Sequence, residues 1–344
     1  MTYLAEYGLF LAKIATIVVA IICVLMTFVA VAIRNRQPSG EQIDIKKIND
    51  RYRDMAEAVE MSTLSPTHAK KKQKEQKKQR KADTKAEKKD NSVAKKRVFV
   101  LNFDGDIRAS EVMLLREEIT AILLGSREGD EVVLRLESAG GMVHAYGLAA
   151  SQVIRLRDAG LHVTVAVDKV AASGGYLMAC VASKILAAPF AIIGSIGVVA
   201  EMPNFNRLLK KHDIDYEQIS AGEYKRTVTM LGETTDKARS KVQEEVEQTH
   251  NLFKEFVKEK RPILDLDAVA TGEHWLGIQA FDLKLVDELR TSDDYLMSLR
   301  DAADIFEVEY SIKKKVLDRL SGIVGALRGP KLPLDSFDSF TQMK

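Results

Sequence analysis

Beyond Arg97 the chain alternates between strand-like and helix-like segments, and this alternation limits the possible folds more than any other feature. Apolar segments rich in Val, Leu and Ile predict strands at 97–107, 131–138, 161–170 and 184–189. Helical periodicity predicts helices at 110–126, 142–160, 173–183 and 235–260. Strands that alternate with helices are typical of a mostly parallel sheet with crossover helices. We therefore expect an α/β domain of repeated β-α-β units.

The N-terminal region contains twenty consecutive uncharged residues, from Ile14 to Ile33. Twenty helical residues span roughly the 30 Å thickness of the hydrocarbon core, so we expect a transmembrane anchor at 8–33. A cleaved signal peptide is the alternative, but its apolar region would be shorter, and no small-x-small cleavage site precedes Arg34. The apolar stretch 170–200 is instead expected in a buried core, because Lys184, Pro189 and several glycines interrupt it.

Charged residues around the anchor bear on its orientation. Four basic residues follow it closely, namely Arg34, Arg36, Lys46 and Lys47. The positive-inside rule would then keep the following domain cytoplasmic. Long domains translocate largely regardless of charge, however, so the residues themselves leave the side of the membrane open.

The segment 69–97 is strongly basic. It holds fourteen Lys or Arg against four acidic residues, a net charge of +10 in a chain whose total is +2. We expect residues 34–96 to form an amphipathic and lysine-rich linker that is too polar to build a core. The basic strip lies close to the anchor and favours contact with anionic membrane lipid. Nucleic acid is not an expected partner, because no aromatic side chains alternate with the lysines.

Three glycine-bearing turns follow predicted strands, where parallel sheets place their functional groups. The first contains Gly140 and Gly141, and adjacent glycines let a substrate carbonyl approach bare backbone N–H groups. In the second, Ser173 precedes two further glycines at the change from strand to helix. Such a serine is either a nucleophile beside an oxyanion hole or simply a helix N-cap. The third turn, at 194–197, contains Ser195.

One lysine follows a further glycine turn, at Lys225. A lysine acts as a general base only when its amine is neutral near working pH, so composition alone does not distinguish this lysine from solvated ones. The six histidines lack ligand spacing, and Cys23 and Cys180 lie in separate apolar runs. We expect no metal site and no cofactor.

The motifs AASGGY, GSIGV and GEYKR occur in this order, at 171–176, 194–198 and 222–226. Together they resemble the SohB branch of the signal peptide peptidase A family, and PNFNRLLKKHDI, TVTMLGE, VATGEHW and LVDE continue the resemblance over roughly residues 97–289. It implies the ClpP/crotonase-like fold and a serine peptidase with a Ser-Lys dyad. Ser173 would be the nucleophile, Lys225 the base, and Ser195 the serine that helps to position the lysine.

The same resemblance implies the rest of the catalytic assembly. The backbone N–H groups of Gly141 and Gly174 would form the oxyanion hole, although Ala139 stands where the family usually has a proline that stiffens this turn. Residues 97–300 would form the peptidase domain and 301–344 a C-terminal extension. Homo-oligomeric rings of subunits would complete one another's sites. Their substrates would be membrane-derived peptides such as signal-peptide remnants, on the periplasmic side of the bacterial inner membrane.

Three alternatives compete with this interpretation. His144, just after the first glycine pair, could serve a Ser-His-Asp peptidase, but an ordinary polar helix histidine is the commoner case. Acyl-CoA hydratases and isomerases also use paired backbone donors, so the fold alone does not decide. A catalytically silent membrane scaffold is the third. We expect the anchor and linker to contribute no core, so that a chain beginning near Lys95 folds.

Overall fold

The computed structural model describes residues 2–34, 41–65, 67–69, 71–75, 78 and 95–312. The chain divides into two compact units, one of residues 1–42 and 311–344 and the other of residues 43–310. In the first, α1 (Thr2–Arg34) is a single helix whose segment Gly8–Thr27 is long and apolar enough to cross a membrane. It is the one helix of this kind in the described part of the chain, in accord with a single-pass anchor. The predicted apolar N-terminal helix is confirmed.

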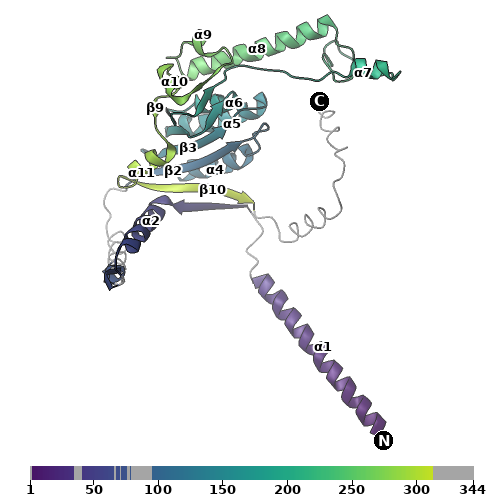
Figure 1. Ribbon diagram of the computed structural model, residues 1–344, viewed down its shortest axis with the longest axis vertical. Coiled ribbons are helices and arrows are strands. Elements are labelled where there is room, and N and C mark those ends of the chain that lie inside the picture. Colours follow the sequence, from purple (N-terminus) through teal and green to yellow (C-terminus); the bar gives the residue numbers. More distant parts are fainter. Residues whose placement is uncertain are drawn as a thin grey trace. The chain divides into compact units, whose positions relative to one another are not determined.

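The second unit is built on a ten-stranded sheet (Figure 1). The main path runs β1-β10-β2-β3-β4-β6-β9, and a branch leaves β3 in the order β5-β7-β8. Neighbouring strands from β10 to β9 and from β3 to β7 are parallel, whereas β7 and β8 are antiparallel. The strands are β1 (Glu41–Lys47), β2 (Lys96–Gly105), β3 (Glu131–Ser138), β4 (His162–Val167), β5 (Val170–Ala172), β6 (Lys184–Ala187), β7 (Ile192–Gly194), β8 (His274–Leu276), β9 (Glu288–Leu289) and β10 (Ala303–Ile312). The predicted α/β fold of repeated β-α-β units is confirmed.

The two faces of the sheet bury different side chains, because successive residues of a strand point to opposite faces. On one face Leu134 lies in the main core, which includes side chains of α4 (Val112–Gly125), α5 (Val143–Asp158) and α6 (Gly174–Ala179). On the other face Val133 lies in a second core with Ile48 of α2 (Ile48–Thr63) and Leu296 of α11 (Ser292–Leu299). The central strands are mainly apolar, because both of their faces are covered.

The compact unit, residues 43–310, includes more of the sequence at both ends than the expected peptidase domain of residues 97–300. β1 and α2 fall in the range expected as linker, and β10 falls in the range expected as C-terminal extension. Asn49 joins them, since its Nδ2 donates to the carbonyl oxygens of Arg300 (2.8 Å) and Ala303 (2.9 Å). Its Oδ1 accepts from the N–H of Ile305 at 2.7 Å. The lysine-rich residues 79–94 and the C-terminal residues 313–344 lie outside the described residues, and the division into functional domains stays a prediction.

We expect a chain that begins near Lys95 to be less stable than one that begins at Glu41. Ile48 is buried in the second core, and removal of a buried aliphatic side chain costs about 2–5 kcal/mol. Each lost hydrogen bond of Asn49 adds about 1 kcal/mol. Thermal denaturation of the two truncated chains measures the difference. Equal melting temperatures would show that the linker contributes no core after all.

A long helix, α8 (Asp236–Lys260), is anchored mainly at its C-terminal end, and the predicted helix at 235–260 is confirmed. Its 25 residues span about 37 Å. Val257 enters the main core, and Arg261 makes a bidentate ion pair with Asp287, at 2.8 and 2.9 Å. Figure 1 shows α7 (Asn206–Lys211) toward the other end of α8, away from α6. The remaining helices are α9 (Leu266–Val269) and α10 (Gly277–Asp282).

Candidate active site

The three glycine turns identified in the sequence lie side by side at one edge of the branched sheet. Ser138, the last residue of β3, pairs with Ala171 of β5, and Ala172 pairs with Gly194, the last residue of β7. Because these strands are parallel, their carboxyl ends meet at the same edge. The turns after β3, β5 and β7 therefore form one site.

Ser173 has an unusual backbone conformation, with φ at 51° and ψ at −117°. It occupies the N-cap position of α6, yet its side chain makes no capping hydrogen bond, so the hydroxyl does not cap the helix. Backbone contacts hold the residue in place, since its N–H donates to the carbonyl of Gly194 at 2.8 Å and its carbonyl accepts from Leu177 at 3.0 Å. A non-glycine residue with positive φ stores about 1–3 kcal/mol of strain, and such strain is concentrated at functional sites. Ser173 is half-buried, and within the described residues its hydroxyl makes no hydrogen bond.

The glycines around Ser173 are required by close packing. A Cβ atom on Gly140 would lie 2.7 Å from both the nitrogen of Gly174 and the Cβ of Ser173. A Cβ on Gly141 would overlap the carbonyl of Ile107, and one on Gly174 would overlap the ring of Tyr146. The turn after β3 therefore lies directly against the residue that is the candidate nucleophile.

Two backbone amides beside Ser173 are free to bind a ligand. Within the described residues, the N–H groups of Gly141 and Gly174 donate no hydrogen bond. Gly174 is the first residue of α6, where helical N–H groups have no partner inside the helix. Free amides that lie close to a serine hydroxyl are the donors that an oxyanion hole needs.

A buried polar network supports the first turn, and sequence reasoning missed it. The Oγ of Ser138 lies 2.5 Å from the Oη of Tyr146, which donates to the carbonyl of Asp106 at 2.7 Å. The same Oγ accepts from the N–H of Gly140 at 3.1 Å. Burial raises the pKa of Tyr146, so its hydroxyl stays protonated and remains a donor. This network fixes the turn that contains Ala139.

Ser195 lies next to Ser173 in the third turn and also has a positive φ, of 52°. Its N–H donates to the carbonyl of Glu273 at 2.6 Å. The ring of Trp275 packs under the preceding glycine, where an added Cβ would lie 2.7 Å from the ring. His250 of α8 contacts this turn through a hydrogen bond of 3.2 Å between its Nε2 and the carbonyl of Ile196. Neither His250 nor Trp275 stood out in the sequence by spacing alone.

Within the described residues, no hydrogen bond joins Lys225 to Ser173. Lys225 is exposed, and its turn contacts the start of α8, where Glu223 pairs with Lys237. The third glycine turn instead contacts α8 at His250. The thirteen residues from Lys237 to His250 correspond to about 20 Å along the helix, so the two turns contact α8 at well-separated positions. The dyad therefore stays a prediction.

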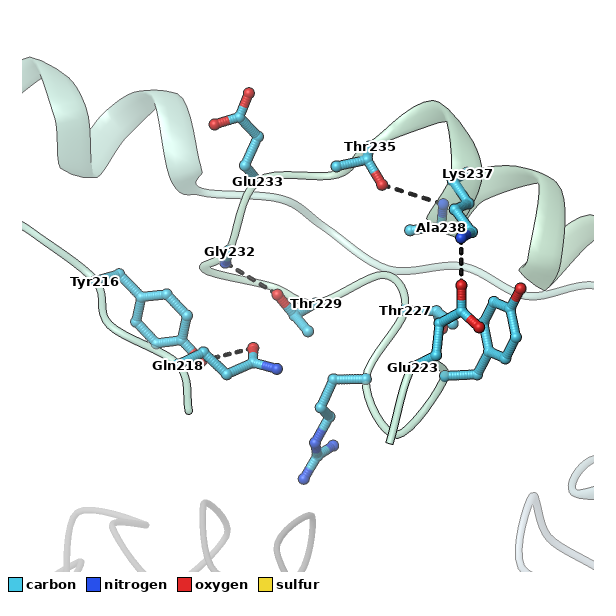
Figure 2. A pocket seen from close by; sticks show the side chains of 12 residues that line it. Tyr216, Gln218, Glu223, Thr227, Thr229, Gly232, Glu233, Thr235, Lys237 and Ala238 are labelled. Carbon is cyan, nitrogen blue, oxygen red and sulfur yellow. Dashed lines mark hydrogen bonds and ion pairs between the residues drawn. The ribbon is translucent and has the colours of Figure 1, made fainter. Parts of the chain in front are cut away.

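His144 is the remaining candidate that the sequence singled out, and a cavity lies near Lys225. His144 is exposed in the first turn of α5 and makes no hydrogen bond within the described residues. A cavity of about 400 Å³ lies around the N-terminal end of α8 (Figure 2). Its lining includes Tyr224 and Arg226, on either side of Lys225, but not Ser173.

Replacement of Gly141 by alanine is expected to lower the predicted peptidase activity by about 100-fold, because the turn must shift and one candidate oxyanion donor moves with it. Gly147 provides a matched control in α5, since a Cβ there would meet nothing within 4 Å. Gly147→Ala should keep full activity and gain about 0.5–1 kcal/mol of stability. Equal rates for the two variants would argue against a role of the Gly141 amide.

Comparison with known proteins places the chain in a family of peptidases. Residues 2–153 match the model "Peptidase family S49 N-terminal", and residues 155–305 match "Peptidase family S49". "Probable protease SohB" of Haemophilus influenzae is 48% identical over 323 residues, covering 92% of this chain and 91% of the relative. "Probable protease SohB" of Buchnera aphidicola subsp. Acyrthosiphon pisum is also 48% identical, with 94% and 95% covered.

A solved structure of a mutant of the "1510-N membrane-bound stomatin-specific protease", in complex with a substrate peptide, is 13% identical. It aligns with a TM-score of 0.40 over 67% of this chain and 99% of its own. The family resemblance found in the motifs is confirmed by the family models and the SohB relatives. The chain belongs to peptidase family S49.

Proposed function

We propose that this peptidase is a membrane-anchored serine endopeptidase with Ser173 as nucleophile and Lys225 as general base. The observation that carries the proposal is the backbone of Ser173. Its φ is positive, its Cβ packs against the turn of Gly140 and Gly141, and the amides of Gly141 and Gly174 donate no hydrogen bond within the described residues. A strained serine at such a turn is typical of serine hydrolases with an exposed nucleophile.

The proposed reaction is acyl transfer in two steps. The neutral amine of Lys225 accepts the proton of Ser173 Oγ, which forms a bond to the carbonyl carbon of the substrate. The N–H groups of Gly141 and Gly174 stabilise the negative carbonyl oxygen of the tetrahedral intermediate. Lys225 then protonates the leaving amine as the peptide bond breaks, and a water molecule hydrolyses the acyl-enzyme by the same route.

Lys225 would reach Ser173 from a neighbouring subunit. In a single chain the turn of Lys225 and the turn of Ser195 contact α8 at positions about 20 Å apart along the helix. The family resemblance implies rings in which subunits complete one another's sites, and α8 extends far enough to carry a lysine across such an interface. Ser195 would orient that incoming amine beside Ser173.

Co-expression of two inactive variants tests this arrangement. Ser173→Ala and Lys225→Ala chains should each be inactive alone, and mixed assemblies should regain part of the wild-type activity. In these assemblies, one chain supplies an intact serine and another an intact lysine. Two inactive variants that fail to complement each other would place the base within the same chain as the nucleophile.

The proposed substrates are apolar peptides derived from membrane proteins, including signal-peptide remnants. α1 would hold the enzyme at the bilayer, with anionic lipid beside the basic linker. Three exposed apolar side chains lie next to the oxyanion turn, at Ile107, Met142 and Val143. A fluorophosphonate probe separates this proposal from its rivals: labelling at Ser173 supports a peptidase, whereas unlabelled protein favours the scaffold or an acyl-CoA enzyme.

We propose further that the enzyme resides in the bacterial inner membrane with its catalytic domain in the periplasm, as the family resemblance implies. The charges that follow α1 favour the opposite orientation. A single cysteine introduced into the linker, in a Cys23→Ser and Cys180→Ala background, decides between them. Its modification in intact cells by a membrane-impermeant maleimide supports the periplasmic side, and protection until lysis supports the cytoplasmic side.

A further inference from the structure

The turn that carries Lys225 is attached to the first two turns of α8 by the two residues that precede it. The Glu223 carboxylate forms an ion pair with the ammonium group of Lys237 (Figure 2). The ring of Tyr224 lies 5.9 Å from Nζ of Lys237 and 5.4 Å from Nζ of Lys241, measured to the ring centroid. Glu223 therefore contacts Lys237, and Tyr224 contacts both Lys237 and Lys241.

The spacing of those lysines explains the contact. Lys237 and Lys241 are four residues apart, so both side chains lie on the same face of α8. An aromatic ring that faces two ammonium groups makes favourable cation–π interactions with both. The ion pair lowers the pKa of Glu223 and raises the pKa of Lys237, so both groups stay charged over a wider pH range.

Lys225 itself takes no part in these contacts. Its backbone N–H closes the turn by donating to the carbonyl of Gly222 at 3.1 Å, and Gly222 has a φ of 95° that suits a glycine. Within the described residues, its ammonium group makes no hydrogen bond and no ion pair. The turn is thus held by residues 222–224 while the following side chain remains available.

We propose that Glu223 and Tyr224, together with Lys237 and Lys241, form a clamp that presents Lys225 to the nucleophile. Glu223 and Tyr224 are positioning residues, because they act through Lys225 and not on the substrate. The inference rests on the proposed role of Lys225 as general base. We infer in addition that contacts with α8 orient Lys225. The ion pair and the ring contacts would then support catalysis.

We expect the clamp to position Lys225 more than to stabilise the fold. The side chains of Lys237 and Glu223 are 68% and 59% exposed, and exposed ion pairs contribute little to the stability of a fold. Their value lies in restricting a short loop, since a base must be held within hydrogen-bond reach of the proton it accepts. Loss of the clamp should therefore reduce turnover without unfolding the protein.

A charge exchange in the full-length protein tests the ion pair. Glu223→Lys and Lys237→Glu should each lower kcat about fivefold with little change in KM, because the base is misplaced while substrate binding is retained. The double variant restores an opposite-charge pair and should return kcat to within about twofold of wild type. Lys210–Glu233 is a matched exposed ion pair at 3.0 Å, and Glu233→Lys should leave kcat within about twofold.

Tyrosine replacements test the ring contacts. Tyr224→Phe keeps the aromatic face and should retain wild-type kcat, whereas Tyr224→Leu should lose about threefold. Single variants that match wild type, or a double charge exchange that restores nothing, would overturn the clamp. Lys225→Ala is measured alongside: full activity in that variant refutes the base itself. An inactive Lys225→Ala together with neutral clamp variants refutes only the positioning role.

Discussion

Replacement of Ser173 by alanine is expected to reduce peptide hydrolysis by ~10³-fold or more, because the hydroxyl is the attacking group and the remaining amides cannot form an acyl-enzyme. Hydrolysis of casein or of a fluorogenic apolar peptide by the full-length protein measures the loss. The fold should persist, since the residue is held by backbone hydrogen bonds to Gly194 and Leu177 that alanine also makes. Fluorophosphonate labelling should vanish together with activity.

A glycine at the same position separates catalysis from stability. Ser173→Gly also removes the hydroxyl, but it relieves the strain of a φ of 51°. We expect this variant to be as inactive as the alanine variant and to be about 1 kcal/mol more stable than it. The assignment of the nucleophile fails if either variant keeps wild-type turnover. The assignment of strain fails if the two melting temperatures are the same.

Lys225→Arg is expected to be nearly as damaging as Lys225→Ala, although arginine keeps the charge and approximate length. A general base must exist in its neutral form near working pH, and a guanidinium effectively never loses its proton. Steady-state kcat of the two variants and of wild type provides the comparison. Tm should change little in both variants, because Lys225 is exposed and makes no side-chain hydrogen bond or ion pair within the described residues.

The size of the residual rate decides the role of this lysine. If Lys225→Arg keeps more than about a tenth of the wild-type rate, the barrier has risen by only ~1.4 kcal/mol and Lys225 is not the base. His144, which lies in the first turn of α5, would then be the next candidate. Under the present proposal, His144→Ala should retain wild-type activity.

Local sequence patterns predicted several of the central strands and helices. β3 begins and ends at the predicted residues, 131 and 138, because an apolar run there is bounded by Asp130 and by a glycine turn. The sequence also predicted that the glycine turns follow strands, and the structure adds that these turns meet at one edge. That arrangement needs only the parallel pairing of β3, β5 and β7.

Contacts between segments far apart in the sequence could not be predicted from these local patterns. β1 reads EQIDIKK, a short polar segment next to a lysine-rich stretch, and only its pairing with β10 identifies it as a strand. The network of Ser138 and Tyr146 was missed because a tyrosine within an apolar helix face looks like ordinary core. The position of Lys225 depends on how a loop lies along α8, and no periodicity in the sequence encodes that.

The anchoring of α8 gives this helix the mechanics of a lever. Its fixed end includes Phe253, Phe256 and Val257 at the main core, the hydrogen bond of His250 to Ile196, and the ion pair between Arg261 and Asp287. The segment from Asp236 to His250 extends over about 21 Å, so a tilt of about 10° at His250 would move the N-terminal tip by about 4 Å, more than the length of a hydrogen bond. Small changes in packing around His250 and Phe253 are therefore magnified at Lys225, so the alignment of the base is sensitive to residues far from the scissile bond.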